Sequence, residues 1–491
     1  MRKIWHGGIF LLLLFFVWTP LSACAAEDQK QLQPILQLLL ADRSPHVSVL
    51  ESIVPPGGEV HVRLTNMPGN PEDWVGIYPV DAPNDWNSQV GWAWVTQKGA
   101  QILTIAIGNL QPGIYEARFF LNNSFEVEEK CRFLVYESNA VPRPVYVDDA
   151  GLPELTGSEY GAMGEHEVRR VSVASPWPGY ADDPNVNVDI YYPAGPTASH
   201  PTVFFIAGYG MYHSETYRSL LYFIASQGYV CVFVPHKNTG PDFHPEILLT
   251  ILDGIATRFS PIIDTSQVGY AGHSEGGGLI FYLARARANW GSRGRFLFSM
   301  AAWWGFNLPE TGIVDYPDKT NLIIQMGDPA YDRGTDPRQN IDLLLHNNIP
   351  AARKTYLYLP GDARHIADHG ISYSTLQNGS YIYDALEQVG LYRPLESLMR
   401  YSFAGDMRGK KIGLPEPGDA GYDVLYEQNG ITVLSTDDPL GNHAVPIPPE
   451  DQLDPSYLCR QNDPNGYYNP RWRMCMPCQD TSRDIPWQQC Q

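Results

Sequence analysis

A G-x-S-x-G turn between a buried strand and a helix constrains this chain more than any other feature. The turn is residues 272–276, Gly-His-Ser-Glu-Gly, and the apolar run 268–271 before it predicts a buried strand. The apolar run 279–284 after it predicts a helix. A serine in such a strand-to-helix turn has an exposed hydroxyl, and the N–H groups that begin the helix point toward developing negative charge. The pattern predicts that Ser274 is a nucleophile.

Strands and helices alternate from about residue 161 to residue 400. Strands are predicted at 167–173, 186–192, 202–206, 229–234, 295–301, 321–325 and 355–359, and helices at 217–226 and 246–258. Alternation of this kind is typical of a mainly parallel sheet that is covered by helices on both faces. The predicted fold class of residues 161–400 is therefore α/β, with a doubly wound sheet.

A serine hydroxyl becomes a good nucleophile only when a neighbouring base takes its proton. In chains with this kind of turn, the acid and the histidine of the triad follow the serine in the sequence. His365 follows the strand at 355–359, which is where a histidine can reach over the turn, so we expect His365 to be the base. His369 lies one helical turn later and is the alternative.

The acid of the triad should follow the strand at 321–325. Asp328 and Asp332 both lie in the loop after it, whereas Asp336 precedes a proline and has the pattern of a helix N-cap. We prefer Asp332 because it stands a short loop before that helix, and Asp328 is the alternative. The acid would hold the histidine in the correct tautomer and stabilise its imidazolium form.

Two backbone N–H groups are needed to bind the oxyanion that forms when an acyl group is attacked. One is expected from Glu275, the residue after the nucleophile. The other is expected from Tyr209, in the loop after the strand at 202–206.

These motifs carry a resemblance to a known family. Residues 161–390, about half of the chain, resemble the α/β-hydrolase family of bacterial cutinases, polyester hydrolases and chlorophyllase-like or dienelactone-hydrolase-like serine esterases. The run 272–278, GHSEGGG, is close to the family's GHSMGGG, and Tyr209 matches the tyrosine of its oxyanion loop. Trp304 falls where the family has a tryptophan beside the substrate. The resemblance implies ester hydrolysis without a cofactor or a metal. Departures from the family, among them Glu275 in place of methionine, Gly305 in place of histidine and a longer acid loop, together argue against polyester as the substrate.

Residues 46–137 have a different pattern, because short strands such as 59–64 and 101–107 alternate with Pro/Gly turns. Strands at this spacing predict an all-β, Ig-like sandwich, and the segment resembles a SKICH-type module. Its tryptophans at positions 74, 92 and 94 are expected in the core. Residues 138–160 are rich in Pro, Asp and Gly, which predicts a linker.

Residues 1–24 predict an export signal. A positively charged start is followed by the apolar run 9–18, which is too short to span a bilayer as a helix. Residues 21–24, LSAC, resemble a bacterial lipobox, in which Cys24 would carry a lipid anchor. Cleavage at the A-x-A pattern of residues 23–25 is the alternative. We expect an exported protein, lipid-anchored in the cell envelope or otherwise secreted, with membrane contact only through Cys24.

Residues 401–491 predict a loop-rich tail. Four cysteines crowd its end, namely Cys459, Cys475, Cys478 and Cys490. Outside the cytoplasm such a group favours two disulfides over a zinc site, and the sequence does not choose among the three pairings. The two remaining cysteines of the mature body, Cys131 and Cys231, lie in strand-like runs and are expected to be buried apolar residues.

The net charge of −20 disfavours a partner with a phosphate backbone, so nucleic acid is not an expected ligand. Together the motifs predict an exported serine hydrolase that cleaves small-molecule or polymeric carboxylic esters through Ser274, His365 and Asp332. Two alternatives stay open. One is a serine peptidase that uses the same triad, and the other is a surface binding protein in which the hydrolase unit is a scaffold.

Overall fold

The computed structural model describes residues 44–415 and the four short strands 426–428, 431–435, 467–469 and 474–476. Within the first range it omits residues 149–150, 181–182, 184–185, 196–197, 238–243, 303–304, 310–312, 328–331, 333–336 and 362–364. The predicted leader with Cys24, and the tail cysteines with their predicted disulfides, lie outside the described residues and side chains. Among the described residues, no helix has both the length and the apolar character needed to cross a membrane.

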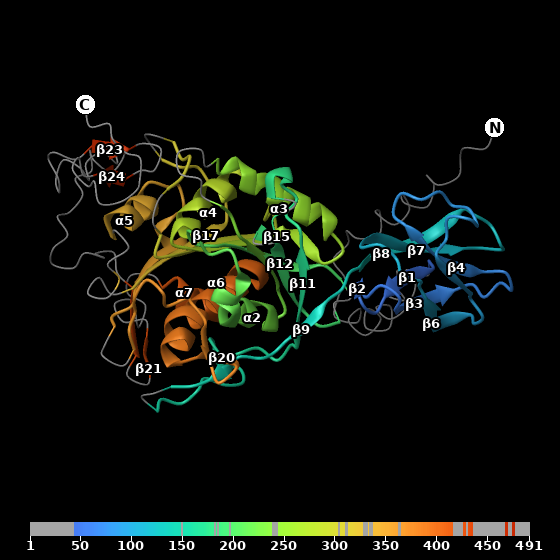
Figure 1. Cartoon of the computed structure of the whole chain (residues 1–491), viewed down its shortest axis with the longest axis horizontal. Coiled ribbons are helices and arrows are strands. Elements are labelled where there is room, and N and C mark those ends of the chain that lie inside the picture. The colour runs from blue at the N-terminus through green and yellow to red at the C-terminus, as the bar shows by residue number, and fades with distance from the viewer. Residues whose placement is uncertain are drawn as a thin grey trace, which may run out of the picture.

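One large mixed sheet forms the body of the chain (Figure 1). Its strands, in order across the sheet, are β21 (Tyr426–Gln428), β22 (Ile431–Ser435), β18 (Lys354–Tyr358), β17 (Thr320–Met326), β16 (Gly294–Met300), β15 (Ile263–His273), β13 (His200–Ile206), β14 (Val230–Val234), β12 (Val188–Pro193), β11 (Val168–Val173) and β9 (Asn139–Val141). The strands from β18 to β14 are parallel, and both flanks are antiparallel. The continuous apolar runs of the sequence become the central strands because these are buried on both faces.

Helices cover both faces of this sheet. The helices are α2 (Arg218–Ser226), α3 (Glu246–Arg258), α4 (Glu275–Ala286), α5 (Pro337–Leu345), α6 (Arg393–Ala404) and α7 (Met407–Gly413). Apolar side chains of α3, α4 and α5 join one core cluster, and those of α2 and α6 join a second cluster on the opposite face (Figure 1). Short helical turns lie between these strands and helices. They are η1 (Pro178–Tyr180), η3 (Ser214–Tyr217), η5 (Ala351–Arg353) and the π-helical η6 (Glu387–Tyr392).

The segment predicted as a linker is fixed to the body. Its strand β9 pairs with β11, and β10 (Val145–Tyr146) pairs with β20 (Ser380–Tyr383), which also pairs with β19 (Thr375–Gln377). Farther along, the Gly161 amide donates to the buried carboxylate of Glu396 at 2.6 Å. The Pro/Gly-rich composition therefore gives turns here, and backbone pairing with β11 and β20 gives the segment its position.

The predicted domain boundary at residue 400 falls inside α6, which ends at Ala404. Gly405 has φ 70° at the C-cap, and the Asp406 carboxylate accepts hydrogen bonds from the amides that begin α7. Beyond α7, strand β22 pairs with β18. Part of the segment predicted as a tail thus extends the large sheet, and β23 (Tyr467–Asn469) pairs with β24 (Met474–Met476) apart from it.

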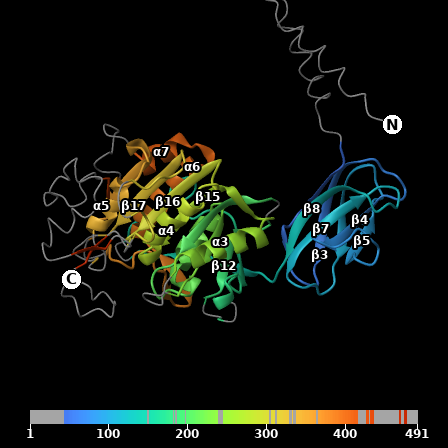
Figure 2. The same ribbon diagram turned by 90° about the horizontal axis from the view of Figure 1, so that it is seen from above.

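Residues 46–135 form two sheets that share one core cluster. One sheet contains β1 (His46–Val49), β3 (Glu59–Met67) and β6 (Gly99–Ala106), and the other contains β2 (Ile53–Val54), β8 (Val127–Val135), β7 (Gly113–Phe120), β4 (Trp74–Pro79) and β5 (Gly91–Trp94). Figure 2 shows this module beside the α/β body. The Tyr136 ring at the end of the module packs against Phe259 of the body, with ring centroids 4.9 Å apart.

The expectation that all three tryptophans lie in the core is right for Trp74 and wrong for Trp92 and Trp94. Trp74 is buried, whereas Trp92 is 37% and Trp94 is 40% exposed. All three tryptophans lie on the face turned away from the shared core, since Trp74 pairs with Trp94 across neighbouring strands. Rings of Phe120 and Trp86 pack on Trp74, whereas β5 is the edge strand of its sheet and leaves Trp92 and Trp94 exposed. Cys231 is fully buried in β14, as predicted, and Cys131 is half-buried in β8.

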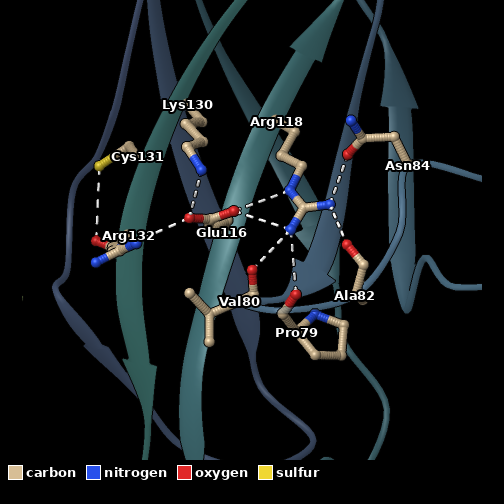
Figure 3. Close-up of polar contacts among 9 residues, drawn as sticks. All are labelled: Pro79, Val80, Ala82, Asn84, Glu116, Arg118, Lys130, Cys131 and Arg132. Atoms are coloured by element: carbon tan, nitrogen blue, oxygen red, sulfur yellow. Dashed lines mark hydrogen bonds and ion pairs between the residues drawn. The ribbon is translucent and has the colours of Figure 1, made fainter. Parts of the chain in front are cut away.

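One buried carboxylate organises the outer face of the five-stranded sheet (Figure 3). Glu116 on β7 is fully buried and contacts Arg118, Lys130 and Arg132 at 2.9, 2.9 and 3.2 Å. Burial by itself would raise the pKa of Glu116, but hydrogen bonds from these three cations outweigh burial and lower the pKa below its ordinary value. Glu116 therefore stays ionised and fixes the Arg118 guanidinium.

We expect Glu116→Gln to destabilise the module by about 2–3 kcal/mol, because it leaves buried Arg118 without its counter-charge while Lys130 and Arg132 are half exposed. The stability that ionised Glu116 adds is complete above the ordinary carboxyl pKa of about 4.3 and is lost as the pH falls through the lower folded-state value. Thermal unfolding of both proteins across the acid range should therefore show a gap that narrows on acidification. Exposed Glu126→Gln is the control, and a gap that persists unchanged in acid would contradict this role.

Candidate active site

Ser274 occupies a sharp turn between β15 and α4. Its backbone has φ 56° and ψ −120°, a conformation that costs energy for any residue with a side chain. The neighbouring glycines explain how the turn closes, because a Cβ on Gly272 would lie 2.4 Å from the Gly276 carbonyl oxygen and a Cβ on Gly276 would lie 2.1 Å from that of Ile206. Backbone strain at a serine in a strand-to-helix turn is the geometry expected of a nucleophile elbow.

The two residues predicted to bind an oxyanion lie at the carboxyl ends of two neighbouring parallel strands. β13 and β15 are parallel neighbours with Ile206 opposite Gly272, so the loops that follow them leave the sheet together. Tyr209 lies in the first loop and its side chain is 55% exposed. Glu275 is the first residue of α4, and its side chain is fully buried.

The structure brings Asp332 together with His369. The Asp332 carboxylate is fully buried, and its Oδ1 lies 3.3 Å from Nδ1 of the His369 ring, which is 30% exposed. Asp332 follows β17 and His369 follows β18, at the same end of two neighbouring parallel strands. This pair has the form expected of the acid and the base in a triad.

His365, the histidine preferred from the sequence, does not pair with Asp332. Its Nε2 lies 3.1 Å from Oδ2 of Asp148, 217 positions away in the chain. Asp148 also accepts hydrogen bonds from the amides of Leu152 and Ala385. Burial opposes ionisation of Asp148, but the Leu152 amide and the His365 ring outweigh it and keep the pKa of this carboxyl below its ordinary value. His365 therefore anchors the segment after β10, and the alternative His369 takes the place beside Asp332.

A small polar cavity of about 120 Å³ adjoins His365, with Asp384 and Glu387 in its lining. These two acids form a reciprocal capping box, because each side chain accepts a hydrogen bond from the other's backbone amide at 3.0 Å. This capping box begins the helical segment that leads through η6 into α6, which explains why the two carboxylates lie here.

A chain of hydrogen bonds joins the three loops of the site. The Gly208 amide donates to the Tyr217 hydroxyl at 3.1 Å, and that hydroxyl lies 3.1 Å from Nδ1 of His273. On the other side of the ring, His273 Nε2 lies 2.7 Å from the carbonyl oxygen of His369. A carbonyl only accepts, so Nε2 carries the proton. Burial, aided by His369, lowers the pKa of His273 to about 3, so the ring is neutral and Nδ1 accepts from Tyr217.

His273 was visible in the sequence only as the variable position of G-x-S-x-G. Its ring also packs against those of His369 and Tyr373, with centroids 4.7 and 5.1 Å apart. The ring therefore fixes the backbone of the histidine loop against the residue that precedes Ser274. No sequence signal for this contact exists, because its two ends are 96 positions apart.

A second buried histidine supports the loop that carries Tyr209. His236 Nε2 lies 3.0 Å from the carbonyl oxygen of Ala207, just before Tyr209. Burial lowers the pKa of His236 to about 4, so this ring is also neutral and donates one N–H. Asp328 and Trp304, the alternative acid and the predicted substrate contact, lie outside the described residues.

No protein-family model matches this chain, and the search of curated proteins finds no match. Within the residues that the structure describes, no group of three or more His, Cys, Asp or Glu side chains is arranged to hold a metal ion. The chemistry of the site is therefore inferred from Ser274, Asp332, His369 and the backbone around them.

Proposed function

We propose that this chain is an exported serine hydrolase of the α/β-hydrolase fold that cleaves carboxylic esters. The observation that carries the proposal is the contact of the Asp332 carboxylate with Nδ1 of His369 next to the strained turn that holds Ser274. The hydrogen bond from His273 Nε2 to the His369 carbonyl supports the proximity of His369 to Ser274, because His273 and Ser274 are consecutive residues.

In the proposed first step, Ser274 Oγ attacks the acyl carbon of the ester while His369 takes the serine proton. Nδ1 of His369 faces Asp332, so the proposal assigns the serine proton to Nε2, the other ring nitrogen. Asp332 holds this tautomer and stabilises the imidazolium that forms. The carbonyl π electrons move to its oxygen, which becomes the oxyanion of a tetrahedral intermediate.

The amides of Tyr209 and Glu275 are proposed to bind that oxyanion. The parallel pairing of β13 with β15 supports this assignment, because the segments that follow both strands leave the sheet at the same end. One such donor typically contributes a factor of about 10²–10³ in turnover. His369 then gives its proton to the departing alcohol oxygen, which leaves the acyl group on Ser274.

Water completes the cycle by the same path. His369 takes a proton from the water, the hydroxide oxygen attacks the acyl carbon, and the proton returns to Ser274 Oγ as the carboxylic acid leaves. The chain order Ser274, Asp332, His369 agrees with the order of triads on this type of turn and supports the proposed fold. The preference for esters over amides rests on the sequence resemblance.

A fluorophosphonate probe and a short-chain p-nitrophenyl ester test the proposal on the mature chain. We expect the probe to label the wild-type protein and the ester to be hydrolysed. Ser274→Ala should lose both reactions without a change in melting temperature, whereas exposed Ser260→Ala should keep both. A wild-type chain that is inert to both reagents would favour the binding-protein alternative. Faster release of an aminoacyl amide reporter than of any ester would favour the peptidase.

The two histidines make a direct comparison. His369→Ala should lower kcat by about 10⁴-fold or more, because Ser274 loses its base. His365→Ala should leave kcat within a fewfold of wild type and lower the melting temperature, because Asp148 loses a hydrogen-bond partner. Steady-state kinetics and thermal unfolding of both variants measure this. The reverse pattern in kcat would return the role of base to His365.

His273 is proposed to position the loop that carries the base. His273→Leu removes the donor to the His369 carbonyl, and we expect the rate of fluorophosphonate labelling to fall by about 10²-fold, as a displacement near 1 Å can cause. His273→Gln can place an amide N–H near the Nε2 position, so it should recover most of that rate. If both variants label at the wild-type rate, or if labelling falls only in proportion to melting temperature, the positioning role is refuted.

A further inference from the structure

The outer face of the five-stranded sheet carries a continuous group of exposed aromatic rings, which we call the tryptophan face. Trp86, Trp92, Trp94 and Phe125 are 45, 37, 40 and 40% exposed. The Trp86 and Trp92 centroids lie 5.1 Å apart, and those of Trp92 and Trp94 lie 5.2 Å apart. Buried Trp74 supports the group, with centroids 5.7 Å from both Trp86 and Phe125. Contiguous exposed aromatic surface on a folded module is typical of a binding site.

The loop that carries Trp86 is held in place by buried groups (Figure 3). The Arg118 guanidinium donates to the carbonyl of Ala82 at 2.8 Å and to the side-chain oxygen of Asn84 at 2.6 Å. The Tyr78 hydroxyl donates to the carbonyl of Asp85 at 3.2 Å, one residue before Trp86. Because Glu116 neutralises Arg118 from the other side, the aromatic group is preorganised, which reduces the entropy lost on binding.

The tryptophan face lies away from the candidate active site. β5 is at one edge of its sheet and β2 is at the other, and β2 is the edge that lies nearer the α/β body (Figures 1 and 2). The docking contact of Tyr136 with Phe259 is also on the side of the body. A ligand on Trp92 and Trp94 would therefore leave the turn at Ser274 accessible.

The polar groups around the rings limit the chemistry of the ligand. Residues 79–95 contain three Trp, two Asn, two Asp, one Gln and one Ser, and no Lys or Arg. Lys130 and Arg132 share Glu116 with Arg118 and are half exposed, but they lie on β8, which β7 and β4 separate from β5. The segment that carries the rings therefore offers no cation of its own to phosphate headgroups or to an acidic polymer. It offers indole rings for apolar C–H faces and amides and carboxylates for hydroxyl groups.

We propose that the tryptophan face binds a neutral polysaccharide chain. A sugar ring presents an apolar C–H face and a rim of hydroxyls, which matches indoles bordered by amide and carboxylate groups. The planes of Trp86 and Trp92 differ by 59° and those of Trp92 and Trp94 by 84°, so the surface is not flat. It fits a single bent chain better than a crystalline sheet, and it would hold the hydrolase unit beside a glycan matrix.

Native electrophoresis of the mature full chain through gels that contain soluble glycans tests this proposal. The neutral probes are hydroxyethyl cellulose, xyloglucan, laminarin and galactomannan, and polygalacturonate is the anionic probe. We expect at least one neutral glycan to retard the wild-type chain. The double variant Trp92→Ala/Trp94→Ala should weaken that binding by at least about tenfold, as loss of aromatic hot-spot residues does.

Ile102→Ala is the matched control, because Ile102 is 54% exposed on β6 in the other sheet of the module. Trp92→Phe/Trp94→Phe keeps aromatic faces and should restore part of the retardation. Melting temperature and p-nitrophenyl ester turnover should be unchanged in all of these variants, which separates glycan binding from the proposed catalysis. The proposal is overturned if no neutral glycan retards the chain, if the alanine variant is retarded like wild type, or if polygalacturonate or phosphatidylglycerol vesicles bind more tightly.

Discussion

A neutral, fully buried imidazole holds the candidate active site together. His273 accepts a hydrogen bond from Tyr217, which in turn accepts one from the amide that begins the Tyr209 loop, and it donates to the carbonyl of His369. A charged ring could not serve in this way, because protonated Nδ1 would donate and would no longer accept from Tyr217. Burial keeps the ring neutral, so the packing of the core determines the direction of each hydrogen bond in this chain.

This chain of hydrogen bonds can form only because backbone segments approach closely around Ser274. Gly272 and Gly276 leave no room for a Cβ, and this closeness lets β13, β15 and the start of α4 meet at one point. The strained φ of Ser274 is tolerated because hydrogen bonds on both sides fix the turn, including one from the Ser274 amide to the Met300 carbonyl at 2.9 Å. Strain that is held by its surroundings is what a preorganised nucleophile requires.

The β module follows the same principle with an ion pair in place of the imidazole. Buried Glu116 gathers Arg118, Lys130 and Arg132, and Arg118 then fixes the loop that carries Trp86. The segment that carries Trp86, Trp92 and Trp94 has no Lys or Arg, so its exposed surface consists of aromatic rings with amide and carboxylate groups. In both parts of the chain, a buried polar group with satisfied hydrogen bonds determines the shape of the surface above it, at the candidate active site and at the tryptophan face.

Local features could be predicted from the amino-acid sequence, because they depend on residues that are neighbours in the chain. The helix predicted at 246–258 is α3, Glu246–Arg258, and the turn at Ser274 lies between a strand and a helix as its glycines predict. The sequence also narrowed the acid to Asp328 or Asp332 and the base to His365 or His369. Only the tertiary structure paired Asp332 with His369 and His365 with Asp148, because hydrogen bonds over such separations depend on where the strands carry their loops. Likewise, alternation placed Trp92 and Trp94 on one face of a strand, but whether that face is covered depends on β5 being an edge strand.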